Sequence, residues 1–312
     1  MEIYIIIMGI VLILFILLTM SYYRNKYVEE KDEFHNELVN IDSYFYSERY
    51  VSESKRRKIW LHIPFEKNSR NWSNFGSRTS TDLNLAYMML CMKSIIDYCG
   101  SSYDIIIIDD TNFADLLKND IDMLKLSGSL KDKYRELCLM QILYKYGGLI
   151  VPPSLYLHKN IKEIDDPSIW YVAEITNKEN VSYAPLYPST IFTGSPANNV
   201  QLNDYINYYS EQIANDFGEH SLHFSHNYMR KHNIHKLDGK LIGVKDKFNK
   251  PLMIEDLMEN KQILLDDRHV GVYIPHTELI KRTKYNWYCA LNAEEVLKCN
   301  IFISNYMLSM QK

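Results

Sequence analysis

Residues 132–160, DKYRELCLMQILYKYGGLIVPPSLYLHKN, constrain the fold more than any other part of the sequence. Apolar residues recur at helical spacing over 134–146, which predicts a helix that is buried on most of its sides. The Gly147-Gly148 pair is expected to end this helix, because glycine adopts the left-handed conformation that closes a helix C-terminus. A short buried strand is predicted over 149–151. It ends at Pro152, since proline donates no hydrogen bond to a sheet ladder.

The flanking sequence predicts an α/β domain around this stretch. The run 103–108 is apolar throughout, which is typical of a central strand in a sheet covered on both faces. Strand-like and helix-like patterns alternate along the chain, with strands expected at 58–64, 103–108 and 170–175 and helices at 83–99 and 200–213.

Polar residues follow two of these predicted strands. Asp109 and Asp110 come directly after the strand 103–108, and Arg70 and Arg78 lie in the polar loop after 58–64. The carboxyl ends of strands in open α/β sheets line the ligand crevice, so these side chains are candidates for nucleotide, phosphate or sugar contacts. The alternatives are an ordinary surface loop for the two arginines, and turn formation or helix capping for the two aspartates.

The central stretch resembles the glycosyltransferases of the sugar-binding-region DXD type, a retaining GT-A family. In that family a helix ending in Tyr-x-Tyr-Gly-Gly is followed by a short strand, and the resemblance lies in Leu143, Tyr144, Tyr146, the glycine pair and the strand 149–151. The first strand, KIWLHIP, and the acidic pair after the second are similar as well. The resemblance implies a GT-A-like, Rossmann-like fold with a mostly parallel central sheet flanked by helices.

The sequence departs from this family where the cation should bind. Counted from the glycines, the family's Asp-x-Asp falls on Pro152, Pro153 and Ser154, and its helix Asp falls on Glu136. Hard divalent cations need anionic oxygen ligands, which proline and serine do not supply, so we expect no divalent metal here. This Pro-Pro-Ser variant is similar to a group of membrane proteins of large DNA viruses.

The predicted binding residues combine this resemblance with the strand-end positions. We expect a nucleotide sugar as donor if the protein is active, with cationic side chains in place of the metal. The candidate substrate-binding residues are Arg70, Arg78, Asp109, Asp110, Arg135, Glu136 and Ser154, with no metal ligand among them.

The N-terminus has the pattern of a single-pass membrane anchor. Residues 3–20 form an uninterrupted apolar run, close to the length of a membrane-spanning helix, and a signal peptide would need a basic start and a small-residue cleavage site. We therefore expect an anchor over 1–22, a charged stalk over 23–57 and a globular domain over 58–312. Arg24 and Lys26 follow the run, which favours a cytosolic globular domain by the positive-inside tendency. A virion membrane is the alternative location.

Three functions remain open from the sequence. They are a membrane-anchored glycosyltransferase working without the usual metal, a catalytically inactive descendant with a structural or interaction role at a membrane, and a glycan-binding module. The net charge of −4 argues against nucleic acid as a partner.

Overall fold

The computed structural model describes residues 18–22, 41, 43–47, 51, 55–63, 85–176, 186–215 and 221–310. The chain divides into two compact units, Met1–Tyr44 and Phe45–Lys312. In the first unit, residues 18–22 are helical. Among the described residues, no helix has the length and apolarity needed to cross a membrane. Most of the predicted anchor lies outside them, so the anchor stays a prediction.

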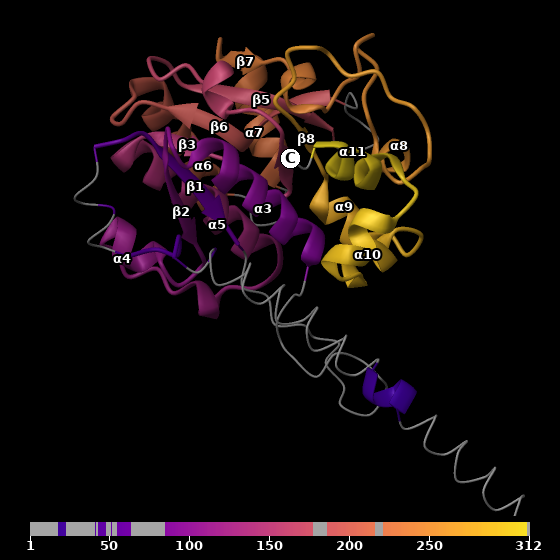
Figure 1. The fold of residues 1–312 in the computed structure, drawn as a ribbon. Helices are drawn as coiled ribbons and strands as arrows, with labels where there is room; N and C mark the ends of the chain where they lie inside the picture. Colours follow the sequence, from indigo (N-terminus) through magenta and orange to yellow (C-terminus); the bar gives the residue numbers. More distant parts are fainter. Residues whose placement is uncertain are drawn as a thin grey trace, which may run out of the picture. The chain divides into compact units, whose positions relative to one another are not determined.

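The second unit is built on a six-stranded sheet with the order β2-β1-β3-β6-β5-β7 (Figure 1). The neighbours β1/β2, β1/β3 and β5/β7 are parallel, whereas β6 is antiparallel to both β3 and β5. Only β6 therefore runs against the rest of this sheet, which confirms the predicted α/β class with a mostly parallel sheet. The strands are β1 Lys58–His62, β2 Asp104–Ile108, β3 Gly148–Ile150, β5 Tyr171–Thr176, β6 Leu186–Ser195 and β7 His235–Leu237.

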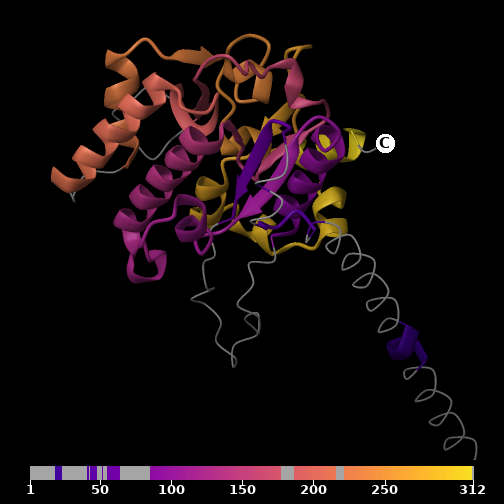
Figure 2. The same cartoon turned by 90° about the vertical axis from the view of Figure 1, so that its left-hand side faces the viewer.

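Both faces of this sheet are covered, as the apolar strands require. Alternate strand residues point to opposite faces, and Trp60, Ile106, Ile150 and Val172 share one core cluster with buried residues of α5, α6 and α7. These helices gather on one side of the sheet, and α3 lies on the other with the C-terminal helices (Figure 2). The bounds are α3 Ala86–Cys99, α4 Phe113–Leu117, α5 Gly128–Tyr146, α6 Val200–Asn215 and α7 Ser221–Lys231.

The glycine pair lets β3 enter the sheet beside β1. Gly147 and Gly148 both have positive φ, at 66° and 108°, and a Cβ on Gly148 would lie 2.4 Å from the carbonyl oxygen of Lys58. The indole of Trp60 donates to the carbonyl of Gly147 at 3.0 Å. The predicted helix, glycine turn and strand are thus confirmed, with α5 beginning earlier than predicted, at Gly128.

A second, two-stranded sheet follows β3. β4 (Leu155–Leu157) pairs antiparallel with β8 (Gly271–Tyr273). The last part of the chain forms several short helices, because residues such as Cys299 have an extended backbone that interrupts helical structure. The remaining helices are α8 Ile254–Leu257, α9 His276–Lys281, α10 Ala293–Lys298 and α11 Phe302–Met310, with the 3-10 turns η1 Met123–Lys125, η2 Ile161–Glu163, η3 Gly239–Ile242 and η4 Asn286–Ala290.

A buried carboxylate ties the amino ends of the strands together. Arg57 donates two hydrogen bonds to Asp165, at 2.7 and 2.9 Å. The hydroxyls of Tyr103 and Tyr171 each donate to the same carboxylate at 2.9 Å. The side chain of Asp165 is only 3% exposed, so its charge is balanced inside the fold.

Two histidines and a tyrosine join β4, the approach to β8 and α11. The hydroxyl of Tyr306 lies 2.6 Å from Nδ1 of His158 and 3.1 Å from Nε2 of His269. Burial is the main reason that the pKa of His158 is lowered to about 4, with His269 and Lys159 adding to the effect. Burial also lowers the pKa of His269. Both rings are therefore neutral in the folded protein at neutral pH.

Replacement of Gly148 by alanine should strongly destabilise the protein. We expect a loss of about 3 kcal/mol, because the new Cβ meets the backbone of Lys58 and the residue keeps a left-handed conformation. Gly128→Ala is the matched control, since Gly128 also has positive φ but nothing lies within 4 Å of its Cβ position. It should cost only about 1 to 2 kcal/mol. Urea unfolding measures both, and equal losses would contradict the close approach of β3 and β1.

Acid should weaken the fold through the histidine pair. The unfolded chain protonates its histidines near pH ~6.5, whereas the folded pKa of His158 is about 4. The unfolded state therefore binds more protons between these values, and the free energy of unfolding falls as the pH drops through this window. His158→Gln should flatten that part of the pH profile of urea unfolding. An unchanged slope would contradict the neutral state of His158.

Candidate functional site

The candidate site lies where β1 and β2 end and α5 begins. The two strands are parallel and in register from Lys58↔Asp104 to His62↔Ile108. Their carboxyl ends therefore bring His62 next to the acidic pair that follows β2. Asp110 is the centre of this group, with its side chain 2% exposed.

Three basic side chains surround the carboxylate of Asp110. Arg135 binds it with two nitrogens, Nε at 2.9 Å from Oδ1 and Nη2 at 2.7 Å from Oδ2. The Nζ of Lys131 lies 3.0 Å from Oδ2, and Nε2 of His62 lies 3.0 Å from Oδ1. We call these four residues the Asp110 cluster. Lys131 and Arg135 reach the same carboxylate because residues four apart share one face of a helix.

Electrostatics keep Asp110 ionised. Burial opposes the charged form, but hydrogen bonds from His62 and Arg135, with the charge of Arg135, outweigh it and hold the pKa of Asp110 well below its ordinary value. The ring of His62 is fixed against Phe113, with centroids 5.2 Å apart. The negative charge of Asp110 is thus already matched, which leaves it poorly suited to bind a cation.

Asp109 and Asp132 flank the Asp110 cluster in different ways. Asp109 accepts hydrogen bonds from the backbone nitrogen and the hydroxyl of Thr111, at 2.7 and 2.6 Å, so it shapes the turn before α4. Asp132 accepts from Nη1 of Arg135 at 3.0 Å, and its side chain is 64% exposed. The turn-forming alternative describes Asp109, whereas Asp110 faces the basic residues of α5.

Glu136 follows Arg135 in the chain but points to a different part of the molecule. Its carboxylate accepts hydrogen bonds from Thr190 at 2.8 Å, Tyr205 at 2.7 Å, Tyr209 at 2.9 Å and Ser225 at 2.7 Å. These hydroxyls come from β6, α6 and α7. Glu136 therefore joins the helical layer to the sheet, and the structure does not bring it to the Asp110 cluster.

Ser154 closes the turn after β3, at the position where the sequence resemblance would place the second Asp of Asp-x-Asp. It is 2% exposed, and its hydroxyl donates to the carbonyl of Ile274 at 2.7 Å. The backbone nitrogen of Ile274 donates back to the carbonyl of Ser154 at 3.1 Å. Within the part of the chain that the structure describes, no group of three or more His, Cys, Asp or Glu side chains is arranged to hold a metal ion.

The predicted residues are thus only partly brought together. Asp110 and Arg135 meet, Asp109 lies beside them, and Glu136 and Ser154 belong to other networks, while Arg70 and Arg78 lie outside the described residues. His62 and Lys131 were missed. Two signals could have identified these residues. His62 lies at the end of a strand that pairs with β2, and Lys131 lies four residues before Arg135 on the same helix.

Comparisons with known proteins add little to this geometry. No family model matches the sequence, and no curated protein matches it. Among solved structures, a chain described as a glycosyltransferase involved in the glycosylation of the major capsid of PBCV-1 aligns with 60% of this chain and 84% of its own, at 12% identity and a TM-score of 0.36.

Asp110→Asn should destabilise the protein more than the same substitution at the exposed Asp132. We expect a loss of about 3 kcal/mol, because Arg135 and Lys131 would lose the buried carboxylate that they share, and Arg135 would keep only the exposed Asp132. Asp132→Asn is the control, since it removes an exposed partner of the same arginine and should cost at most about 1 kcal/mol.

The pH dependence gives a second check on Asp110. Because its folded pKa is lowered, its contribution is complete above the unfolded pKa of about 3.9 and is lost as the pH falls through the folded value. Wild type and Asp110→Asn should therefore converge in unfolding free energy on acidification below about pH 4. A constant difference would contradict the ionised state of Asp110.

Proposed function

We propose that this protein is a membrane-anchored, glycosyltransferase-like protein that binds a nucleotide sugar without a divalent cation at the family's DXD position. The resemblance of the helix, glycine turn and strand supports the family, and the mostly parallel sheet agrees with the fold that it implies. The proposal that no divalent cation is needed rests on the residues that stand where the family has its Asp-x-Asp. There, two prolines offer no ligand and the hydroxyl of Ser154 is bound to Ile274.

The Asp110 cluster supports the proposed place of the donor. It lies at the carboxyl ends of parallel strands, where open α/β sheets bind nucleotides. Lys131 is in the first turn of α5, and Ser127 at the N-cap of this helix makes no side-chain capping bond. The backbone N–H groups of a first helical turn and a nearby ammonium group both attract phosphate oxygens. We propose that the diphosphate of the donor binds there, with Lys131 and Arg135 stabilising its charge.

Catalytic inactivity is the second candidate, and one observation favours it. Asp110 is paired with Arg135, Lys131 and His62, and Glu136 is saturated by hydroxyls. Neither carboxylate is available as a base or a nucleophile in this arrangement. A protein of this kind would retain the fold and use it as a structural or interaction partner at an internal or viral membrane.

Nucleotide-sugar binding by the detergent-solubilised full chain tests these alternatives. UDP- and GDP-sugars should raise the melting temperature equally with manganese and with a chelator. Lys131→Met should weaken donor binding about tenfold, which corresponds to the ~1.4 kcal/mol expected of one charged contact. Lys125→Met is the matched control, because Lys125 lies in the same region, is 82% exposed and pairs only with Asp122 among the described residues. It should bind like wild type.

The outcomes separate the functions. Binding that needs manganese would overturn the metal-free proposal. Binding of no nucleotide sugar by a folded chain would favour the inactive, structural role. Release of free sugar or transfer to an acceptor, followed by chromatography, would establish catalysis.

A further inference from the structure

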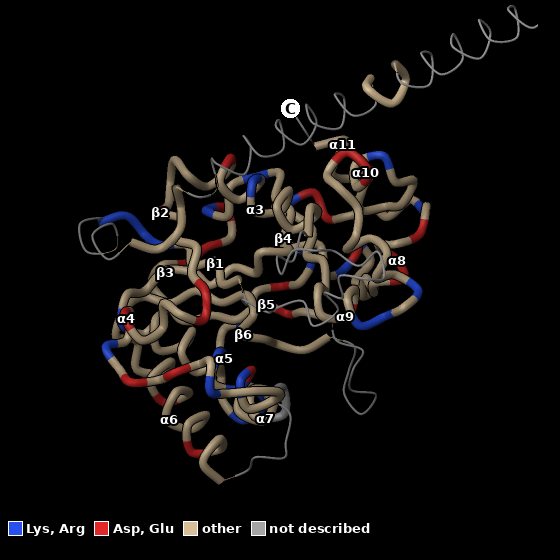
Figure 3. The backbone as a smooth tube through the Cα atoms, turned by 90° about the horizontal axis from the view of Figure 1, so that it is seen from below, with Lys and Arg blue, Asp and Glu red and all other residues tan. Residues whose placement is uncertain are grey.

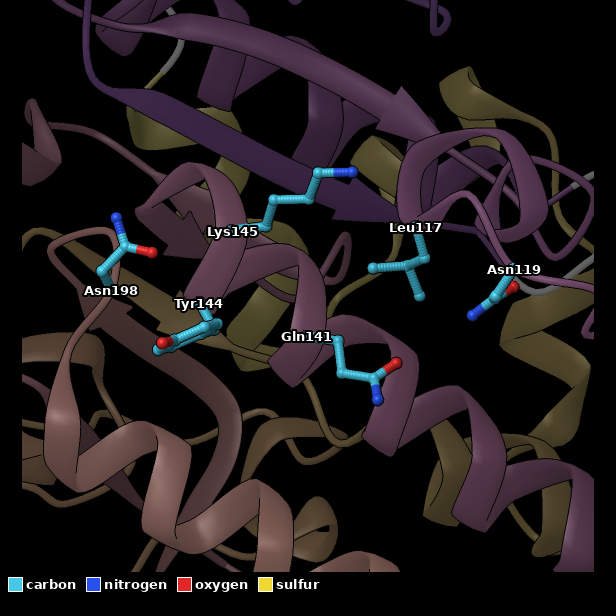
Figure 4. Close-up of a pocket in the computed structure, with 6 residues that line it drawn as sticks. All are labelled: Leu117, Asn119, Gln141, Tyr144, Lys145 and Asn198. Atoms are coloured by element: carbon cyan, nitrogen blue, oxygen red, sulfur yellow. The ribbon is translucent and has the colours of Figure 1, made fainter.

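A pocket lies at the other end of α5 from the Asp110 cluster. It has a volume of about 410 Å³, within the roughly 300–1,000 Å³ of small-molecule sites. Residues from the end of α4, the last turns of α5 and the turn before α6 line it (Figure 4): Leu117, Asn119, Gln141, Tyr144, Lys145 and Asn198. Arg135 and Tyr144 are separated by about 14 Å along the helix, so this pocket is distinct from the proposed donor site.

The lining combines amides with one aromatic ring. Asn119, Gln141 and Asn198 each bring to the lining a side-chain amide, which carries hydrogen-bond donors and an acceptor. Oδ1 of Asn119 accepts from the backbone nitrogen of Ile121 at 3.3 Å, so Asn119 offers a ligand mainly its N–H groups. In Figure 4 Gln141 and Asn119 extend from facing elements, and the ring of Tyr144 lies between Gln141 and Asn198. Sugar hydroxyls also act as both donors and acceptors, and the apolar face of a sugar ring packs on an aromatic side chain.

The charges at the pocket argue against an ionic ligand. Among its described residues the lining contains no acidic side chain, so none of them offers a metal ion an anionic oxygen. Lys145 is the one cation among the described lining residues, and its Nζ donates to the carbonyl of Leu116 at 2.7 Å. Tyr146 donates to the same carbonyl at 2.8 Å. The ammonium group is thus used to hold the end of α4 against α5, and the groups left for a ligand are neutral.

The backbone around the pocket is held in an uncommon conformation. Among the described residues three non-glycine residues have positive φ. One is Asn198 at 58°, which lines this pocket, and another is Lys118 at 55°, which lies in the chain between the lining residues Leu117 and Asn119. The backbone nitrogen of Asn198 donates to the carbonyl of Tyr144 at 2.7 Å. This bond fixes the turn against α5, so the amide of Asn198 is presented from a rigid position.

We propose that this pocket binds a neutral saccharide unit through the amides of Asn119, Gln141 and Asn198 and the ring of Tyr144. The site is independent of the proposed donor site. In a glycosyltransferase-like protein it would hold a glycan chain on the opposite end of α5 from the nucleotide sugar.

Saturation-transfer NMR on the full chain in detergent tests this proposal with a panel of free sugars: glucose, galactose, mannose, fucose, xylose and N-acetylglucosamine. At least one should bind, and inorganic phosphate should not displace it. Gln141→Leu and Asn198→Gly should each weaken binding about fivefold to tenfold, as expected for the loss of one hydrogen bond. Glycine accepts positive φ, so Asn198→Gly keeps the turn while it removes the amide.

Two control variants show whether sugar binding depends on this pocket. Gln212→Leu alters a half-buried glutamine near the far end of α6 and should bind sugar like wild type. Lys131→Met should also leave free-sugar binding unchanged, which separates this site from the donor site. The proposal is overturned if no sugar in the panel binds, if phosphate displaces the sugar, or if both pocket variants bind as wild type does.

Discussion

The close approach of β3 to β1 at Gly148 is the constraint on which the central sheet depends. β3 lies between β1 and β6, so it joins the parallel part of the sheet to the part that contains the antiparallel strand. A side chain at Gly148 would collide with the backbone of Lys58. The bond from Trp60 to Gly147 holds the turn in place. Since α5 ends and β3 begins at this turn, the same constraint fixes where α5 lies on the sheet.

Three carboxylates join separate elements of the domain to one another. Asp165 joins the amino ends of the strands through Arg57 and two tyrosines. Asp110 joins their carboxyl ends to α5 through basic residues, and Glu136 joins α5 to α6 and α7 through hydroxyls. Basic residues (blue) and acidic residues (red) are interspersed over the described backbone (Figure 3). At the carboxyl edge the charge of Asp110 is thus matched by Lys131 and Arg135, beside the first turn of α5.

The sequence best predicted the elements that depend on interactions between residues close in the chain. The end of α5, the glycine turn and the strand after it follow from helical spacing, glycine and proline, and the apolar run before Asp109 marks β2. The partners of Asp110 were harder to predict, because His62 reaches it only through the pairing of β1 with β2. Arg135 and Glu136 were predicted for one site, yet successive helical residues point about 100° apart, and tertiary packing sends them to separate networks.

The hydrogen bonds of Ser154 limit which side chains this position tolerates. Ser154 is bonded in both directions to Ile274, so the turn fastens the beginning of β4 to the segment after β8. An aspartate introduced there would face a carbonyl oxygen in a buried position, and the resulting repulsion would loosen that attachment before any metal were gained. Position 154 therefore tolerates a small hydroxyl side chain that donates to Ile274, and an acidic replacement would require a second change in the segment after β8.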